Sequence, residues 1–95
     1  TYKSAIQGLC ISLASEFAPN IRVNCIASSI LETKMASRIL RNDKIIESIS
    51  EKHPLKRIGK ASDVSNLVRF LLSDDSSWIT GQIISVDGGM NNVQL

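Results

Sequence analysis

Small hydroxyl side chains follow the most apolar stretch of the sequence, and they are its first candidates for chemistry. The stretch Ile21–Ala27 is rich in β-branched and apolar residues, and it ends in Ser28 and Ser29. A near-continuous apolar run predicts a strand covered on both faces, as in a parallel sheet. A helix-like segment begins at about Glu32. Open α/β sheets hold ligands beyond the carboxyl ends of their strands, so we expect a ligand site at this turn.

The other reactive side chains are few and isolated. His53 is the only histidine, and it lacks Cys, Asp or Glu partners at metal-ligand spacing, so no metal site is predicted. Cys10 falls in a predicted helix and Cys25 in the predicted strand. We expect both cysteines to be reduced and structural, which is typical of a cytosolic protein.

Composition argues against several classes of protein. The 95 residues allow one small domain, and an apolar fraction of 43% is typical of a globular protein. A net charge of +2, scattered Lys and Arg and few aromatic residues argue against a nucleic-acid partner. No apolar run approaches the ~20 residues of a membrane span, and no signal-peptide pattern opens the chain. We therefore expect a cytoplasmic protein without a membrane partner.

The first predicted element is a helix from Tyr2 to about Phe17. Large apolar residues recur every three or four positions on one stripe, and small residues form another. The two sets are Ile6, Leu9, Leu13 and Phe17, and Ser4, Gly8, Ser12 and Ser15. Two uncharged faces need cover on two sides, either as a central core helix or as a helix shared between a sheet and a partner subunit. The helix starts without a cap, which predicts a fragment of a longer protein.

The predicted elements after the strand complete an α/β pattern. Segments 31–41 and 44–52 have helical periods with a break or N-cap at Asn42–Asp43, and they form either a mobile lid or a plain surface hairpin. Gly59 marks a turn, Ser62 is the predicted N-cap of a helix over 63–72, and a strand follows at Gln82–Val86. The order is helix, strand, two short helices, helix, strand. Two parallel strands need neighbours, so we expect more of the sheet upstream.

Several segments, in order, resemble the C-terminal part of the short-chain dehydrogenase/reductase family. They are Lys3–Leu9 for K-A-A-x-x-G-L, Ile21–Ala27 for I-R-V-N-x-I-A-P-G, Glu32–Met35 for x-T-x-M, Arg57–Val64 for R-x-G-x-P-E-D-V, Ile79–Gln82 for I-T-G-Q and Val86–Gly89 for V-D-G-G. The resemblance runs from Lys3 to Gly89. It implies that residues 1–95 are the C-terminal fragment of a single NAD(P)-binding Rossmann-fold domain, a doubly wound parallel sheet.

The resemblance implies a catalytic and cofactor-binding role for Lys3. In the family, the catalytic tyrosine lies four residues before a lysine, so both side chains share one helix face and the ammonium favours the ionised phenol. The same lysine binds the nicotinamide ribose. The tyrosine would lie two positions before Thr1. Tyr2 is adjacent to Lys3 and points in a different direction on a helix, so it is not that tyrosine.

The resemblance also implies that the turn Ser28–Thr33 faces the nicotinamide. Backbone groups around Leu31 would bind the carboxamide, and the Thr33 hydroxyl would reach the carboxamide or the pyrophosphate; the alternative is a Thr33 without a ligand. Ser28 and Ser29 replace the family's Pro-Gly. Proline fixes φ and glycine permits positive φ, so we expect this turn to be more mobile or differently shaped.

The implied function is hydride transfer between NAD(P)(H) and a carbonyl or alcohol substrate. Within the family, the motifs favour enzymes like the 3-oxoacyl carrier-protein reductases, and carbonyl, sugar and steroid reductases share these motifs. A homo-oligomer, a dimer or tetramer, is expected. The Gly-rich loop and the residue that selects NAD or NADP would lie upstream. We therefore expect the 95 residues alone to be inactive. The alternative is a non-catalytic truncated piece or an oligomer-forming module.

Overall fold

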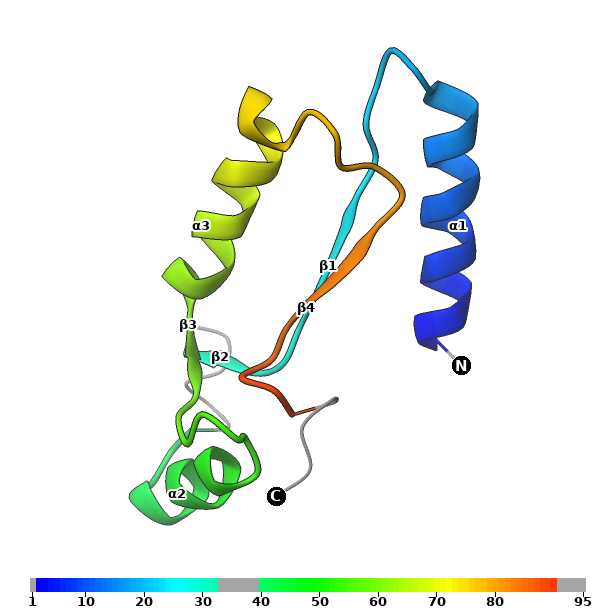
Figure 1. Ribbon diagram of the computed structural model, residues 1–95. Coiled ribbons are helices and arrows are strands. Elements are labelled where there is room, and N and C mark those ends of the chain that lie inside the picture. The colour runs from blue at the N-terminus through cyan, green and yellow to red at the C-terminus, as the bar shows by residue number, and fades with distance from the viewer. Residues whose placement is uncertain (1, 33–39, 91–95) are drawn as a thin grey trace. The chain divides into compact units, whose positions relative to one another are not determined.

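A computed structural model describes residues 2–32 and 40–90 and gives an α/β arrangement (Figure 1). The helices are α1 (Tyr2–Phe17), α2 (Asp43–Glu51), α3 (Ala61–Leu72) and a 3₁₀ helix (Asp74–Ser76), and the strands are β1 (Cys25–Ser28), β2 (Leu31–Glu32), β3 (Gly59–Lys60) and β4 (Ile83–Val86). Strand β1 pairs with β4, and β2 pairs in parallel with β3. Among the described residues, no helix is long and apolar enough to cross a membrane.

The chain forms two compact units, and each is described by itself. The first contains residues 1–27 and 66–85, and the second contains residues 28–65 and 86–95. The first unit holds α1 and most of the β1–β4 pair. The second holds the turn after β1, the β2–β3 pair, α2 and the Asp87–Gly89 turn.

Helix α1 spans Tyr2–Phe17, as predicted, but it does not bury the large apolar stripe. Its buried side chains are Cys10 and Ala14. The Cys10 Sγ lies 3.7 Å from the backbone oxygens of both Val23 and Gln82, so the helix contacts the strands through small residues. Ile6, Leu9 and Phe17 of the predicted stripe are exposed. Small side chains let the helix backbone approach the strands closely, and this turns the large ones away from them.

Strand β1 is shorter than the predicted Ile21–Ala27. Its ladder begins where the Cys25 N–H donates to the Gln82 oxygen at 2.8 Å. Before that point one backbone bond, from the Gly81 N–H to the Val23 oxygen at 2.7 Å, is joined by side-chain bonds: the Val23 N–H donates to Thr80 Oγ1 at 3.1 Å, and the Asn24 side-chain amide donates to the Ile79 oxygen at 3.0 Å. The polar side chains of this stretch thus replace part of the regular pairing. Strand β4 begins one residue after the predicted Gln82–Val86.

The two main strands run in the same direction. The Cys25 N–H donates to Gln82, and the Ser29 N–H donates to Val86, so the partners advance together along both strands. The parallel sheet expected from the sequence is confirmed for the β1–β4 pair. The connection between α3 and β4 contains the short 3₁₀ helix Asp74–Ser76.

Arg22 joins this strand region to the end of α3 within the first unit. Its guanidinium donates to the Leu71 and Ser73 oxygens at 3.0 and 3.2 Å, and to Ser76 Oγ and the Ile79 oxygen at 3.0 and 3.3 Å. Carbonyl groups at a helix C-terminus lack intrahelical partners, so a fork of N–H donors satisfies several of them at once.

The second unit contains a strand pair that the sequence did not predict. Leu31 and Glu32 form β2, where a helix start was expected, and they pair with Gly59 and Lys60 of β3, where a turn was expected. A Cβ added at Gly59 would lie 2.7 Å from Leu31 Cδ2, so the absence of a side chain allows this approach. The rest of the predicted helix over 31–41 falls mainly on residues 33–39, which lie outside the described residues.

The helices of the second unit begin through different side chains. Asn42 is the N-cap of α2, as predicted, and its side chain accepts a hydrogen bond from the Ile45 N–H at 2.9 Å. Helix α3 begins at Ala61, so the prediction of Ser62 as its N-cap is wrong. The Asp63 carboxylate instead accepts from the Lys60 N–H at 2.7 Å and satisfies a free donor at the helix start.

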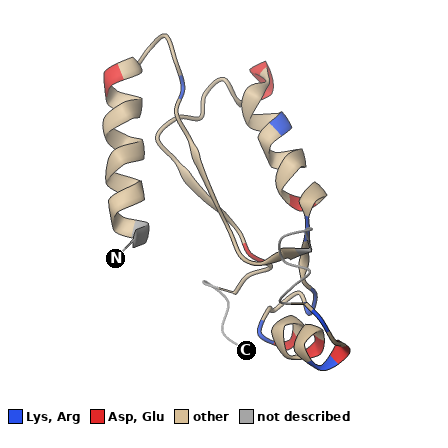
Figure 2. Ribbon diagram, turned by 180° about the vertical axis from the view of Figure 1, so that it is seen from behind, with Lys and Arg blue, Asp and Glu red and all other residues tan. Residues whose placement is uncertain are grey.

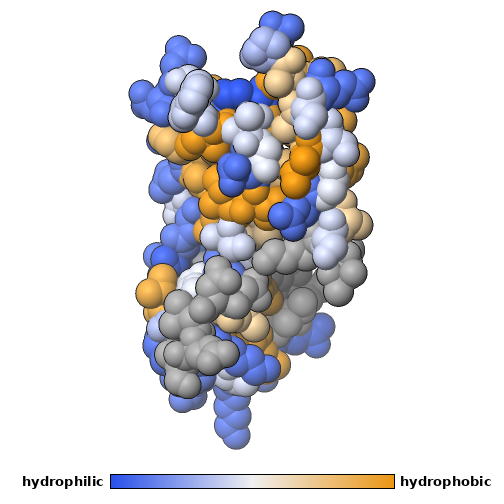
Figure 3. All heavy atoms as spheres, turned by 45° about the vertical axis from the view of Figure 1, so that its right-hand side comes forward, coloured by the Kyte–Doolittle hydropathy of each residue, from blue (hydrophilic) through white to orange (hydrophobic). Residues whose placement is uncertain are grey.

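Charge and apolar surface are distributed unevenly. Charged residues are frequent on α2, whereas α1 is nearly free of them (Figure 2). Apolar side chains gather on the upper half of the face shown in Figure 3. In the first unit, the exposed large apolar residues are Ile6, Leu9, Ile11, Phe17, Ile21, Val68, Phe70, Leu72 and Trp78. Both stripes predicted to need cover on α1, the large apolar one and the small one, are largely exposed among the described residues.

Candidate functional site

The second unit contains a pocket of about 160 Å³ beside the turn that follows β1. Segments far apart in the sequence line it, because the turn, the end of α2, strand β3 and the Asp87–Gly88 turn all contribute. The polar lining side chains are Ser29, His53, Arg57, Asp63 and Asp87, and the apolar ones are Ile30, Leu31, Leu55 and Val86. The turn for which the sequence predicted a ligand site therefore forms part of the wall of this pocket.

Ser28 and Ser29 take different positions. Ser28 is exposed at the end of β1, whereas Ser29 is half-buried in the pocket wall. The Ser29 N–H donates to the Val86 oxygen at 3.3 Å, and its Oγ lies 2.8 Å from His53 Nε2. Among the described residues, Lys56 is the only non-glycine with a positive φ, so the turn is built without the backbone conformation for which glycine would be needed.

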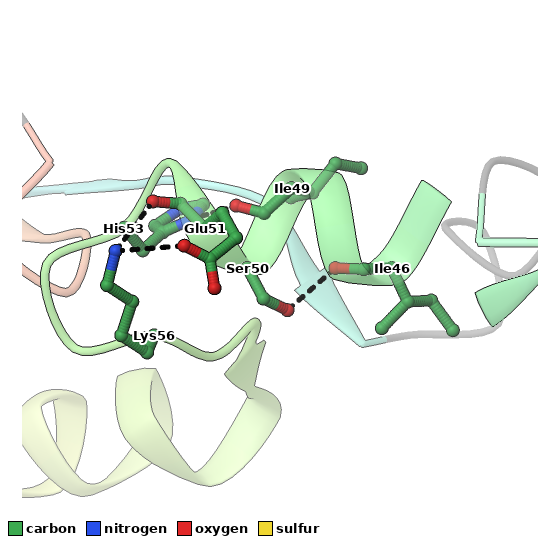
Figure 4. Close-up of polar contacts among 6 residues, drawn as sticks. All are labelled: Ile46, Ile49, Ser50, Glu51, His53 and Lys56. Atoms are coloured by element: carbon green, nitrogen blue, oxygen red, sulfur yellow. Dashed lines mark hydrogen bonds and ion pairs between the residues drawn. The ribbon is translucent and has the colours of Figure 1, made fainter. Parts of the chain in front are cut away.

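His53 is the site residue that sequence reasoning missed, since it was weighed only as a metal ligand. Its side chain is buried, with 3% of the residue exposed. The ring Nδ1 lies 2.7 Å from the Ile49 oxygen at the end of α2 (Figure 4). No local sequence signal pairs His53 with Ser29, because the two are 24 positions apart and meet only through the fold.

The charged side chains of the pocket wall are paired. Arg57 donates to both oxygens of Asp63, at 2.7 and 3.0 Å. The Arg57 hydrogen bond and then the Lys60 N–H hold the pKa of Asp63 well below its usual value, and the hydrogen bond to Asp63 raises the pKa of Arg57. The Asp87 carboxylate is buried and accepts from the Gly89 N–H at 3.0 Å. A charged ligand would compete with these internal contacts, so the wall suits a neutral polar group better.

A second ion pair lies outside the pocket. Lys56 Nζ is 3.2 Å from Glu51 Oε2 and also donates to the Glu51 backbone oxygen (Figure 4). Both side chains are largely exposed, so this pair contributes little to stability. Its contact with a carbonyl in the last turn of α2 helps to close that helix.

The predicted site residues are only partly brought together. Ser29 and Leu31 line one pocket, and Leu31 lies in β2. Lys3 belongs to α1 in the first unit, and its side chain lies outside the described part of the chain, as does all of Thr33. Within residues 2–32 and 40–90, no three His, Cys, Asp or Glu side chains gather in a way that could hold a metal ion. Both Cys10 and Cys25 are free thiols; Cys10 is buried and Cys25 half-buried.

These observations first define a class of protein. Parallel strands joined through helices, with a polar turn at the carboxyl end of β1, are typical of the Rossmann-type α/β fold. The family model described as "Enoyl-(Acyl carrier protein) reductase" matches residues 1–91.

Known proteins narrow that class. Over 87 residues the chain is 45% identical to "Tropinone reductase-like 3" from Erythroxylum coca, covering 92% of this chain and 34% of that protein. It is 44% identical over 88 residues to "Short-chain dehydrogenase/reductase SDRA" from Arabidopsis thaliana, covering 93% and 35%. The structure of 4-hydroxyisoleucine dehydrogenase complexed with NADH is similar with a TM-score of 0.87 and 30% identity, covering 97% of this chain and 38% of that one.

The chain belongs to the short-chain dehydrogenase/reductase family. The resemblance to 3-oxoacyl carrier-protein reductases within this family is only approximate, because the relatives named above include a tropinone reductase-like protein. The chain spans about a third of the length of the curated relatives it matches.

Proposed function

We propose that the protein carrying this chain is a nicotinamide-dependent oxidoreductase that acts on a carbonyl or alcohol substrate. The observation that carries the proposal is the family match over residues 1–91, which includes Lys3 and the turn after β1. A similar solved structure is complexed with NADH, which supports a dinucleotide as the cofactor class. The cofactor, when bound, would supply or accept the hydride.

The proposed role of Lys3 concerns a proton. An ammonium group one helical turn after a tyrosine lowers the cost of ionising the phenol, because opposite charges attract across a short distance. The tyrosine then exchanges a proton with the substrate oxygen as a general acid or base. Lys3 would also donate a hydrogen bond to the ribose of the cofactor.

The proposed role of the turn is to hold the carboxamide of the nicotinamide. Peptide groups around Leu31, together with the hydroxyl groups of Ser28, Ser29 and Thr33, offer neutral donors and acceptors. The pocket wall supports this choice, since the hydrogen bonds between Arg57 and Asp63 already pair its opposite charges. A neutral amide can exchange hydrogen bonds there without the desolvation cost of a buried charge.

We further propose that residues 1–95 are the C-terminal part of a single Rossmann-fold domain. The chain's span of about a third of its curated relatives supports this proposal. A dinucleotide would then need walls from both parts of the domain, so the 95 residues alone should not bind it tightly. Titration of the chain with NADH and NADPH tests this, and binding at micromolar concentration would contradict it. A tyrosine two positions before Thr1 would support the enzyme proposal.

Replacement of Lys3 tests the catalytic proposal in the protein that carries this chain. Lys3→Ala should lower kcat by about 100-fold or more, the usual range for the loss of acid–base assistance. Lys44→Ala, which removes an exposed lysine of α2, is the matched control and should leave turnover unchanged. If Lys3→Ala also leaves turnover unchanged, the proposed role of Lys3 is wrong.

A second candidate is an oligomer-forming module, and the exposed apolar side chains of α1 favour it. Leu9 is 60% exposed on a helix that carries almost no charge. We propose a homodimer or homotetramer that buries this face, in the cytosol, where the two free cysteines would stay reduced. Light scattering after size exclusion should give an oligomer for the chain and a smaller species for Leu9→Lys. A chain that is monomeric at about 100 µM would contradict this proposal.

A further inference from the structure

We propose that His53 is a positioning residue for the turn Ser28–Ile30: its imidazole, fixed by the end of α2, holds Ser29 and thereby takes the place of the rigidity that a Pro-Gly pair would give. The hydrogen bond between the side chains of Ser29 and His53 carries this inference. The statement about the turn itself stands on the contacts in the second unit. Its consequence for cofactor binding rests on the proposed function.

The direction of the hydrogen bonds follows from their acceptors. The Ile49 oxygen, 2.7 Å from His53 Nδ1, can only accept, so Nδ1 carries the proton. In the neutral ring Nε2 is then a bare acceptor. The Ser29 hydroxyl, 2.8 Å away, donates to it. Met90 Sδ, at 3.7 Å, is a weaker alternative acceptor for the same hydroxyl proton.

His53 is itself held in place, so it can act as an anchor. Its backbone N–H donates to the Ser50 oxygen at 3.1 Å, directly after α2. Its ring lies against Gly88, where an added Cβ would be 3.6 Å from His53 Cβ and 3.7 Å from its Cδ2. The Leu55 N–H donates to the Gly88 oxygen at 3.1 Å and keeps that turn beside the histidine. The end of α2 and the Gly88 turn therefore fix the imidazole from two sides.

Among the described contacts of Ser29, the bond to His53 is the shortest. A serine at position 28 leaves φ free, where a proline would lock it. The backbone bond from the Ser29 N–H to Val86 is 3.3 Å long, beyond the usual range for N–H donors, whereas the Ser29–His53 bond is 2.8 Å. The side-chain bond is thus the tighter of these two connections, and its loss should free the turn more than the rest of the unit.

Hydrogen exchange of the residue 29 amide tests the tether without any cofactor. Ser29→Ala and His53→Gln should each lower its protection factor by about 2- to 10-fold, the effect of one net hydrogen bond. Ser28→Ala removes the neighbouring exposed hydroxyl and is the matched control, with no change expected. Ser29→Thr keeps a hydroxyl group, so its residue 29 amide should retain most of the protection measured in the unmodified chain. Equal protection in Ser29→Ala and the unmodified chain would overturn the proposal.

A double-mutant comparison separates positioning from simple packing. In the background Ser28→Pro with Ser29→Gly the turn should be rigid without the tether, so adding His53→Gln should leave exchange of the turn amides unchanged. Cys25 and Ser29 donate to β4, so the N–H of Ser28 lies on the other edge of β1 and its loss breaks no β1–β4 bond. If His53→Gln increases exchange equally in both backgrounds, His53 only fills space and the proposal is wrong.

Two further measurements complete the test. Imidazole ¹⁵N resonances at pH 8 should show a ring protonated at Nδ1, and Ser29→Ala should shift the Nε2 resonance; the opposite tautomer would overturn the proposal. In an active protein carrying this chain, Ser29→Ala should raise the KM for the cofactor several-fold with little change in kcat. An unchanged KM would overturn the link to the cofactor. The exchange and resonance results do not depend on activity, so they stand even if the proposed function fails.

Discussion

Replacing Arg22 by methionine removes four hydrogen bonds between the segment before β1 and residues 71–79, which run from the last turn of α3 to the approach to β4. The guanidinium donates to the oxygens of Leu71, Ser73 and Ile79 and to Ser76 Oγ, at 3.0 to 3.3 Å. Methionine keeps a long apolar stem of similar shape but no donor. We expect Arg22→Met to destabilise the first unit without changing its helices and strands.

The size of the loss follows from what each acceptor keeps. The Leu71 oxygen still accepts from the Ser76 hydroxyl, the Ser73 oxygen still accepts from the Ser76 N–H at 3.3 Å, and the Ile79 oxygen still accepts from the Asn24 amide. Four separate charged hydrogen bonds at about 1.5–3 kcal/mol each would suggest roughly 6–12 kcal/mol, but that range assumes acceptors left without partners. Because no carbonyl is left without a donor, we expect a loss of about 2–3 kcal/mol in the free energy of unfolding.

Related variants sharpen this expectation. Arg22→Lys keeps the positive charge near the C-terminal end of α3 but cannot reach four acceptors, so about 1–2 kcal/mol should be lost. The double variant Arg22→Met with Asn24→Ala leaves the Ile79 oxygen without either donor. Its loss of stability should exceed the sum of the two single-variant losses by about 1 kcal/mol.

Urea unfolding followed by far-ultraviolet circular dichroism measures these free energies. Arg69→Met on the exposed side of α3 is the matched control, and it should change stability by about 0.5 kcal/mol at most. If Arg22→Met costs no more than Arg69→Met, the guanidinium does not hold the end of α3 in solution.

Three further predictions concern other contacts. The hydrogen bond from Arg57 lowers the pKa of Asp63 in the folded state below its usual 3.8. Ionised Asp63 therefore stabilises the folded state above pH 3.8, and this contribution is lost as the pH falls from 3.8 toward the folded-state pKa. Asp63→Asn should therefore lower the urea midpoint of unfolding at pH 7 and make that midpoint fall less steeply as the pH is lowered. If the midpoint falls as steeply in the variant as in the unmodified chain, the ion pair does not stabilise the fold. Gly59→Ala places a Cβ 2.7 Å from Leu31 Cδ2 and should cost about 1 kcal/mol, a loss that Leu31→Ala should relieve in a double-mutant cycle. Cys10 is buried, so Cys10→Leu should lower the free energy of unfolding by about 1–3 kcal/mol through overpacking, whereas Cys10→Ser should cost less; equal effects would contradict the close packing of α1.

Local patterns predicted most of the helices and both long strands. Helix α1 agrees with its prediction at both ends, because a three-to-four-residue period is a property of a single segment. Asn42 was recognised as a break or cap for the same reason, since an N-cap binds N–H groups of its own helix. Parallel pairing also followed from local character, because both strands are apolar and helices separate them.

The wrong predictions fall where a partner distant in the sequence decides the structure. Leu31 and Glu32 open a segment with a helical period in the sequence, but they pair with β3 because Gly59 leaves room for the Leu31 side chain. The large apolar residues of α1 form a regular stripe, yet the helix contacts the strands through Cys10 and Ala14. Periodicity identifies a face, whereas the space between two backbones decides which face is buried.

The candidate site divides in the same way. Its position at the carboxyl end of β1 could be read from an apolar run that ends in Ser28 and Ser29, because that order is fixed along the chain. The tie between Ser29 and His53 could not, because the two residues are 24 positions apart and meet only when the end of α2 and the turn close on one pocket. Covalent order specifies which residues follow a strand, and folding specifies which distant side chain holds them there.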